Sequence, residues 1–194
     1  MKSGVSTAGN RKQEHPKGTQ ACRIETLRVR NFRLFKDVAL KNIPQFCVLV
    51  GANGTGKSTL FDVFGFLKDC LVANVNKAVQ KRGGFHELCS RNANNESILI
   101  EVQFRMQLSE RDRLVTYSLE IGEEKGRVVV LNEVLRYKRQ AFGSPYNFLS
   151  FSRGKGYAIV NEEDFTKKDT DLERENQSLS SPDILAIKGL GQFE

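Results

Sequence analysis

The sequence has few of the residues that build metal sites, disulfide scaffolds or membrane spans. Only two of its 194 residues are histidines, and His15 and His86 are too far apart to indicate a metal site. The four cysteines show no C-x-x-C spacing, which predicts reduced thiols in a cytoplasmic protein. No run of eighteen apolar residues occurs, and the first residues lack a signal-peptide core, so we expect no membrane span.

The composition is that of one globular domain with an uneven charge. A hydrophobic fraction of 39% over 194 residues is enough to bury a real core. The net charge is +7, and part of the excess lies in residues 1–22, which have no apolar period. We therefore expect a disordered basic tail over 1–22. It is either solvated without a partner or in electrostatic contact with nucleic acid.

The most informative stretch runs from Cys47 to Leu67. Cys47–Val50 is a short apolar run that predicts a strand buried on both faces of a parallel sheet. Residues 51–58 follow it and match G-x-x-x-x-G-K-[ST] at every fixed position. An apolar segment of helical length comes next. The order of strand, loop and helix is the one that a phosphate-binding loop requires.

The residue types of this loop suit a magnesium nucleotide. Glycine backbones can converge their N–H groups on phosphate oxygens, and the helix start adds its positive dipole end. Lys57 is predicted to bridge the β- and γ-phosphates, Ser58 to ligate Mg²⁺, and Thr59 to reach the α-phosphate. Asn53 either contacts a phosphate or water, or only tolerates a left-handed turn. The predicted nucleotide-binding residues here are Gly51, Asn53, Gly54, Thr55, Gly56, Lys57, Ser58 and Thr59.

Beyond the loop, the hydrophobic period changes. The pattern from Ser58 predicts an enclosed helix that reaches about Lys81. Alternation with a period of two then predicts an antiparallel β-meander over 97–160. A polar linker follows over 161–181, and a short helical stretch begins at Pro182.

Two motifs carry a family resemblance: N-F-R-L-F-K-D at residues 31–37 and G-A-N-G-T-G-K-S-T-L at residues 51–60. Their order resembles the N-terminal lobe of ABC-type ATPase heads of the RecF and SMC group. The sequence is most similar to the bacterial predicted-ATPase branch of the AAA-like families related to the OLD nucleases.

The resemblance implies an α/β P-loop NTPase fold, with an ABC/SMC-head-like N-terminal lobe, an inserted antiparallel β-subdomain and an incomplete sheet. Residues 23–194 would be the N-terminal half of the ATPase domain, ending before the signature and Walker B motifs. By analogy Asn31, Phe32 and Arg33 line the base or phosphate pocket, although packing is the alternative for Phe32 and Phe35. Gln192 would be the glutamine that contacts Mg²⁺ and water.

Two further candidates for catalysis are weak. Glu133 ends a run, Val128–Glu133, that resembles the Mg²⁺-holding strand of these ATPases. Its first acidic position is Asn132, however, and apolar residues continue beyond it, so we expect no catalytic role. His86 and Glu87 could form an acid–base pair, but adjacent residues usually point apart.

Two classes of function follow. The first is an ATPase that uses ATP and Mg²⁺ and couples hydrolysis to head-to-head homodimerisation, acting on DNA or with a partner nuclease in DNA-related or defence processes. This chain alone should hydrolyse little ATP, because phosphoryl transfer needs further residues. The alternative is a non-catalytic interaction module that binds a partner head or nucleic acid. A P-loop kinase or GTPase ranks third, since no N-K-x-D follows the loop.

Overall fold

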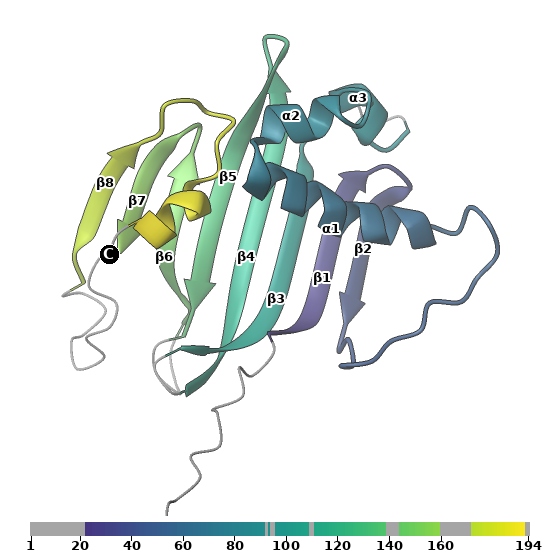
Figure 1. Ribbon diagram of the computed structural model, residues 1–194, viewed down its shortest axis with the longest axis horizontal. Helices are drawn as coiled ribbons and strands as arrows, with labels where there is room; N and C mark the ends of the chain where they lie inside the picture. The colour runs from purple at the N-terminus through teal and green to yellow at the C-terminus, as the bar shows by residue number, and fades with distance from the viewer. Residues whose placement is uncertain are drawn as a thin grey trace, which may run out of the picture.

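A single curved β-sheet is the centre of the molecule in the computed structural model, which describes residues 22–91, 93, 96–108, 111–138, 144–159 and 172–192. Its strands are β1 Arg23–Phe32, β2 Phe35–Lys41, β3 Ile98–Leu108, β4 Arg111–Glu124, β5 Arg127–Tyr137, β6 Tyr146–Ser152, β7 Lys155–Ile159 and β8 Arg174–Ser178. Their order across the sheet is β2-β1-β3-β4-β5-β6-β7-β8 (Figure 1).

Tight turns explain why neighbours in sequence are neighbours in the sheet. Lys125 and Gly126 join β4 to β5 with φ of 51° and 73°. Arg153 and Gly154 join β6 to β7 with φ of 49° and 77°. Two consecutive residues with positive φ are the signature of the two-residue turn whose twist matches that of a β-hairpin. The antiparallel meander predicted over 97–160 corresponds to β3 to β7.

The helices lie over one face of the sheet (Figure 1). They are α1 Lys57–Val72, α2 Val75–Gln80, α3 Phe85–Leu88 and the 3₁₀ helix η2 Ala186–Gln192. Helix α1 buries Val63, Phe66 and Cys70 in the main core, which also holds Leu27 and Ile100 of the sheet. No helix among the described residues is long and apolar enough to cross a membrane.

The strand predicted at Cys47–Val50 is wrong in this structure. Residues 47–50 have no strand assignment, and the side chains of Val48 and Val50 are 66% and 91% exposed. Every strand pair that the structure shows is antiparallel, from β1 with β2 to β7 with β8. No described strand lies beside 47–50, and an extended segment without a ladder partner has no hydrogen bonds to hold it as a strand. The parallel sheet is therefore absent from the described part.

Other boundaries differ more mildly. The helix predicted to reach Lys81 breaks at Ala73, because the side chain of Asn74 accepts a hydrogen bond from Lys77 N and caps a new helix, α2. Helix α1 is also not enclosed: Phe61 and Val72 are 67% and 74% exposed. Part of the predicted linker over 161–181 is strand β8. Residues 160–171 and the predicted tail up to residue 21 lie outside the described residues.

Candidate functional site

The loop before α1 curves around the ammonium group of Lys57. The Lys57 Nζ atom donates hydrogen bonds to the carbonyl oxygens of Gly51 at 2.5 Å and Ala52 at 2.6 Å. It also lies 3.5 Å from the Thr55 hydroxyl, which in turn donates to Ala52 O at 2.9 Å. These contacts close residues 51–57 into one turn at the amino end of a 16-residue helix. Positive charge and unpaired helix N–H groups thus gather at one place.

Glycine is required at the last position of this turn. Gly56 has φ of 97°, a left-handed value, and caps α1 without a side-chain hydrogen bond. A Cβ atom built on it would lie 2.7 Å from the ring of Phe35 on β2. Gly54 also has a positive φ, 82°, but a Cβ there would meet nothing within 4 Å. Phe35 therefore packs directly on the loop, and only Gly56 makes that close approach possible.

A cavity of about 630 Å³ opens beside the turn. Polar groups line it from the loop side, at Thr55 and Lys57. Its other wall is apolar and consists of Leu34, Phe35, Val38, Leu40, Leu49, Val50 and Leu60. The volume lies within the usual range of ligand pockets, about 300–1,000 Å³. One polar and one apolar wall suit a ligand that has a charged part and a flat apolar part.

The predicted loop residues fall into two groups by exposure. Asn53, Thr55 and Ser58 are exposed, whereas Gly56 is buried and Thr59 is only 6% exposed. The hydroxyl of Ser58, in the first turn of α1, is an accessible hard oxygen ligand beside a lysine, which fits the ligand preference of Mg²⁺. That ion would supply Lewis-acid stabilisation to phosphate oxygens.

An ion-pair network fixes α1, which carries the loop. Arg82 is 8% exposed, and its guanidinium contacts Asp62 at 2.9 Å and Asp69 at 2.7 Å, both on α1. Arg33 contacts Asp62 at 2.8 Å. Hydrogen bonds from Lys81 and Arg82 hold the pKa of Asp69 below its usual value. No sequence signal marks this network, because its members are distant in sequence and match no motif.

The three residues of the N-F-R motif do not line the cavity. Asn31 is 1% exposed, and its amide donates to Ala93 O at 2.9 Å and Glu96 O at 2.8 Å while its oxygen accepts from Ser90 N. Phe32 is fully buried against Phe66, with ring centroids 5.7 Å apart. Arg33 pairs with Asp62, as described above. Phe32 therefore packs in the core, which was the alternative to a place in the nucleotide pocket. Leu34 and Phe35 are the residues of this segment that line the cavity.

The candidates further along the chain lie elsewhere. Glu133 on β5 is fully buried and accepts hydrogen bonds from Tyr117 OH at 3.0 Å, Ala186 N at 2.6 Å and Ile187 N at 3.1 Å. Burial raises the pKa of Glu133 above its usual value, although these hydrogen bonds oppose the shift. Gln192 is the last residue of η2, and its side chain lies outside the described part of the structure.

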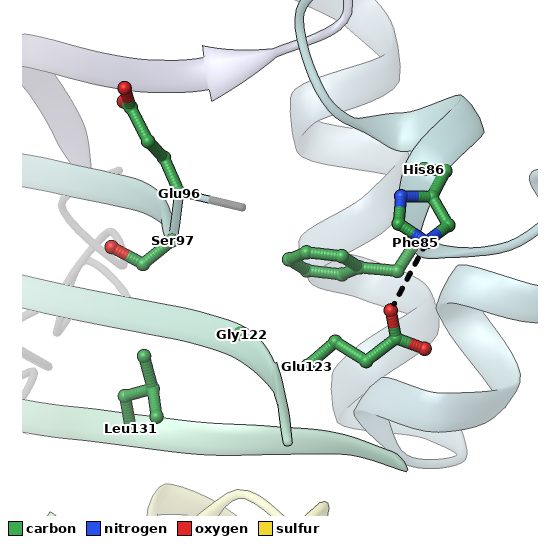
Figure 2. A pocket seen from close by; sticks show the side chains of 7 residues that line it. All are labelled: Phe85, His86, Glu96, Ser97, Gly122, Glu123 and Leu131. Atoms are coloured by element: carbon green, nitrogen blue, oxygen red, sulfur yellow. Dashed lines mark ion pairs between the residues drawn. The ribbon is translucent and has the colours of Figure 1, made fainter. Parts of the chain in front are cut away.

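His86 pairs with Glu123 and not with Glu87, in line with the expectation that adjacent residues point apart. Its Nε2 atom lies 3.4 Å from the Glu123 carboxylate on β4, and this ion pair is the dashed line in Figure 2. No contact with Glu87 is present among the described residues. Ser97 and Glu96 line the same hollow, of about 270 Å³. The Ser97 hydroxyl donates to Glu120 and not to His86. No nucleophile contacts the histidine within the described part of the chain, so the arrangement lacks the nucleophile–base pair of covalent catalysis.

The loop geometry and the motif together define a protein of the P-loop nucleotide-binding class, with a lysine inside a glycine-rich turn that opens a helix. The family model of the AAA ATPase domain matches residues 23–186. The chain belongs to that family, and an ATP-binding, ATPase-type function follows from the membership. No curated protein matches the sequence.

Proposed function

We propose that the chain binds Mg·ATP at Gly51–Thr59. The observation that carries this proposal is the position of the Lys57 ammonium, which lies inside the turn of residues 51–55 and beside the 630 Å³ cavity. In this arrangement Lys57 holds the β- and γ-phosphates, Ser58 holds Mg²⁺, and the nucleoside extends along the apolar wall that includes Phe35.

Slow hydrolysis by this chain alone is part of the proposal. Phosphoryl transfer needs a group that orients the attacking water and further groups that stabilise charge. Among the described residues that line the cavity, none carries a carboxylate, and Lys57 is the only cation. The described lining of the cavity therefore offers one stabilising charge and no candidate base for the water.

The test is a titration of the full chain with a fluorescent ATP analogue and Mg²⁺. Lys57→Ala should weaken binding by about 100-fold or more, because a charge-assisted contact to phosphate is lost along with the organisation of the loop. Lys68→Ala is the matched control: it removes an exposed lysine from the same helix and should bind normally. Equal affinities for Lys57→Ala and the wild type would refute the proposal.

The finer expectations rest on the resemblance and remain proposals. They place the chain in a RecF/SMC-like, OLD-related ATPase head that is cytoplasmic, forms head-to-head homodimers and works with DNA or a nuclease. Light scattering with and without Mg·ATP tests the homodimer. Deletion of residues 1–22 separates two sources of DNA binding: binding that disappears with these residues belongs to the basic segment and not to the ATPase domain.

A specific observation favours the alternative of an interaction module. The side chains of Phe46, Val48 and Val50 are 82%, 66% and 91% exposed on one short segment next to the loop. A contiguous exposed apolar patch often marks a protein–protein interface. A chain that binds a partner through this patch but shows no affinity for nucleotide would support the module over the ATPase.

A further inference from the structure

Glu133 is a buried carboxylate that uses two of its three hydrogen bonds to hold one short segment of the chain. Both peptide N–H donors, Ala186 and Ile187, belong to residues 181–188, which we call the docking segment. Among the described residues, no lysine or arginine forms an ion pair with Glu133. Burial of a carboxylate destabilises the folded state relative to burial of an aliphatic side chain, unless the carboxylate is fully hydrogen-bonded. If the docking segment moved away, the carboxylate would lose two of its three hydrogen-bond donors, so its burial stabilises the docked position of the segment.

The docking segment also contacts the carboxyl end of α1. Lys188 Nζ donates a hydrogen bond of 2.6 Å to the carbonyl oxygen of Ala73, the residue that follows α1. Asp183 O accepts from Val75 N at the start of α2, at 2.9 Å. Helix α1 has no basic residue of its own in its last turn. Lys188 therefore supplies the cation that favours a helix carboxyl end, from 115 positions away in the sequence.

Apolar contacts join the same parts. Leu185, 1% exposed, belongs to the main core together with Val63 and Phe66 of α1. A wholly apolar hollow of about 260 Å³ lies between the docking segment, the sheet and α1, and is lined by Leu185 and Ile187 on one side and Phe64, Leu67 and Leu71 on the other. Leu71 is already 46% exposed, but separation of the segment from α1 would expose the buried Leu185 and more of the partly buried Phe64 and Leu67, which the hydrophobic effect opposes.

We propose that Glu133 and Lys188 form a latch that couples the docking segment to the phosphate loop through α1. This proposal rests on the proposed function, since Lys57 and Ser58 stand at the amino end of the same helix. The helix has 16 residues. At 1.5 Å per residue it spans about 24 Å. A displacement at one end of this rigid helix therefore moves the other end. Nucleotide at the loop strengthens docking, and loss of docking weakens nucleotide binding by the same factor, because coupling is reciprocal.

The first measurement is amide hydrogen exchange with and without a non-hydrolysable ATP analogue and Mg²⁺. In the wild type, nucleotide should slow exchange of the amides of Ala186 and Ile187 about fivefold or more, the lower end of typical coupling factors. In Lys57→Ala the same amides should not respond.

The second measurement is nucleotide affinity. Lys188→Glu places a negative charge beside the carboxyl end of α1. It should weaken binding of the ATP analogue about fivefold, the lower end of typical coupling factors. Lys188 is exposed, so the variant should fold. Lys188→Arg should retain wild-type affinity. Lys155→Glu makes the same charge change at an exposed lysine on β7 and should leave affinity unchanged.

The outcomes separate the latch from the nucleotide site. If the wild type binds nucleotide but the two amides exchange at the same rate, or Lys188→Glu binds as well as Lys155→Glu, the latch is overturned and the nucleotide site stands. If the wild type binds no nucleotide, both are overturned.

Discussion

The loop before α1 and the centre of the sheet hold their structures in opposite ways. Residues 46–50 expose apolar side chains, and the turn that follows is closed by one lysine and one threonine. Strands β3 and β4 instead bury one continuous face, where Ile98, Ile100, Leu119 and Ile121 are at most 1% exposed. The loop holds the proposed nucleotide site and is mostly exposed, whereas the sheet supplies much of the buried apolar core. Substitutions should therefore separate nucleotide binding from stability.

The largest effect on stability should come from the sheet. Ile100→Ala removes a side chain that is 1% exposed in the main core and should lower the free energy of unfolding by about 2–5 kcal/mol. Val50→Ala removes one that is 91% exposed and should change it by less than about 0.5 kcal/mol. Denaturant unfolding of both variants measures the difference. A similar decrease in the free energy of unfolding of both variants would mean that residues 46–50 are buried in solution. The contrast between an exposed loop and a buried sheet would then be wrong.

Within the loop, two glycines with positive φ should behave differently. Gly54→Ala places a methyl group in open space and should cost about 1 kcal/mol of backbone strain. Gly56→Ala adds contact with the Phe35 ring to the same strain, so its cost should reach about 1–3 kcal/mol, with weaker nucleotide binding. Thermal unfolding and the analogue titration give both quantities. Equal behaviour of the two variants would show that Phe35 does not pack on Gly56.

Asn31 tests whether the N-F-R motif is structural. Asn31→Asp removes the amide donors to Ala93 O and Glu96 O and should lower the free energy of unfolding by about 1–3 kcal/mol. Asn42→Asp is the control, since Asn42 also has a positive φ, 54°, but is exposed. Asn31 does not line the cavity, so the affinity of the folded variant for nucleotide should be unchanged. A large loss of affinity without loss of stability would restore its predicted role at the nucleotide.

The smallest effect is a pH dependence. Burial raises the folded-state pKa of Glu133 above its unfolded value, so the folded protein holds this proton more tightly. The resulting stabilisation is fully present below the unfolded pKa and is lost as the pH rises through the folded pKa. Wild-type stability should therefore fall relative to Glu133→Gln as the pH rises above about 4.5, the ordinary value for Glu133.

The comparison with Glu133→Gln isolates this group. Several carboxylates have lowered pKa values and give the opposite slope in both proteins, so their contribution cancels: Glu25, Asp37, Asp69, Glu120 and Glu124. Parallel curves of stability against pH for the two proteins would show that folding does not raise the pKa of Glu133.

The sequence was informative where the signal is local. The glycine and lysine spacing of residues 51–58 predicts the turn before α1, because turn and helix geometry depend on neighbouring residues. Alternation predicts β3, β4 and β5 for the same reason. The prediction of a strand at Cys47–Val50 failed because an apolar run indicates only that burial of these side chains would be favourable. Whether a partner strand lies beside it depends on residues far away in the chain.

Short-range pattern alone thus determined the phosphate loop, the amino end of its helix and the hairpins of the sheet, since each depends on residues within a few positions of one another. Tertiary structure alone decided that Asn31 of β1 bonds to Ser90, Ala93 and Glu96. It also decided that Phe35 rests on Gly56, and that Glu133 and Lys188 contact the docking segment and the end of α1. Those contacts join groups from 21 to more than 100 residues apart, and no local period encodes which distant side chain will fill a place in the packed interior.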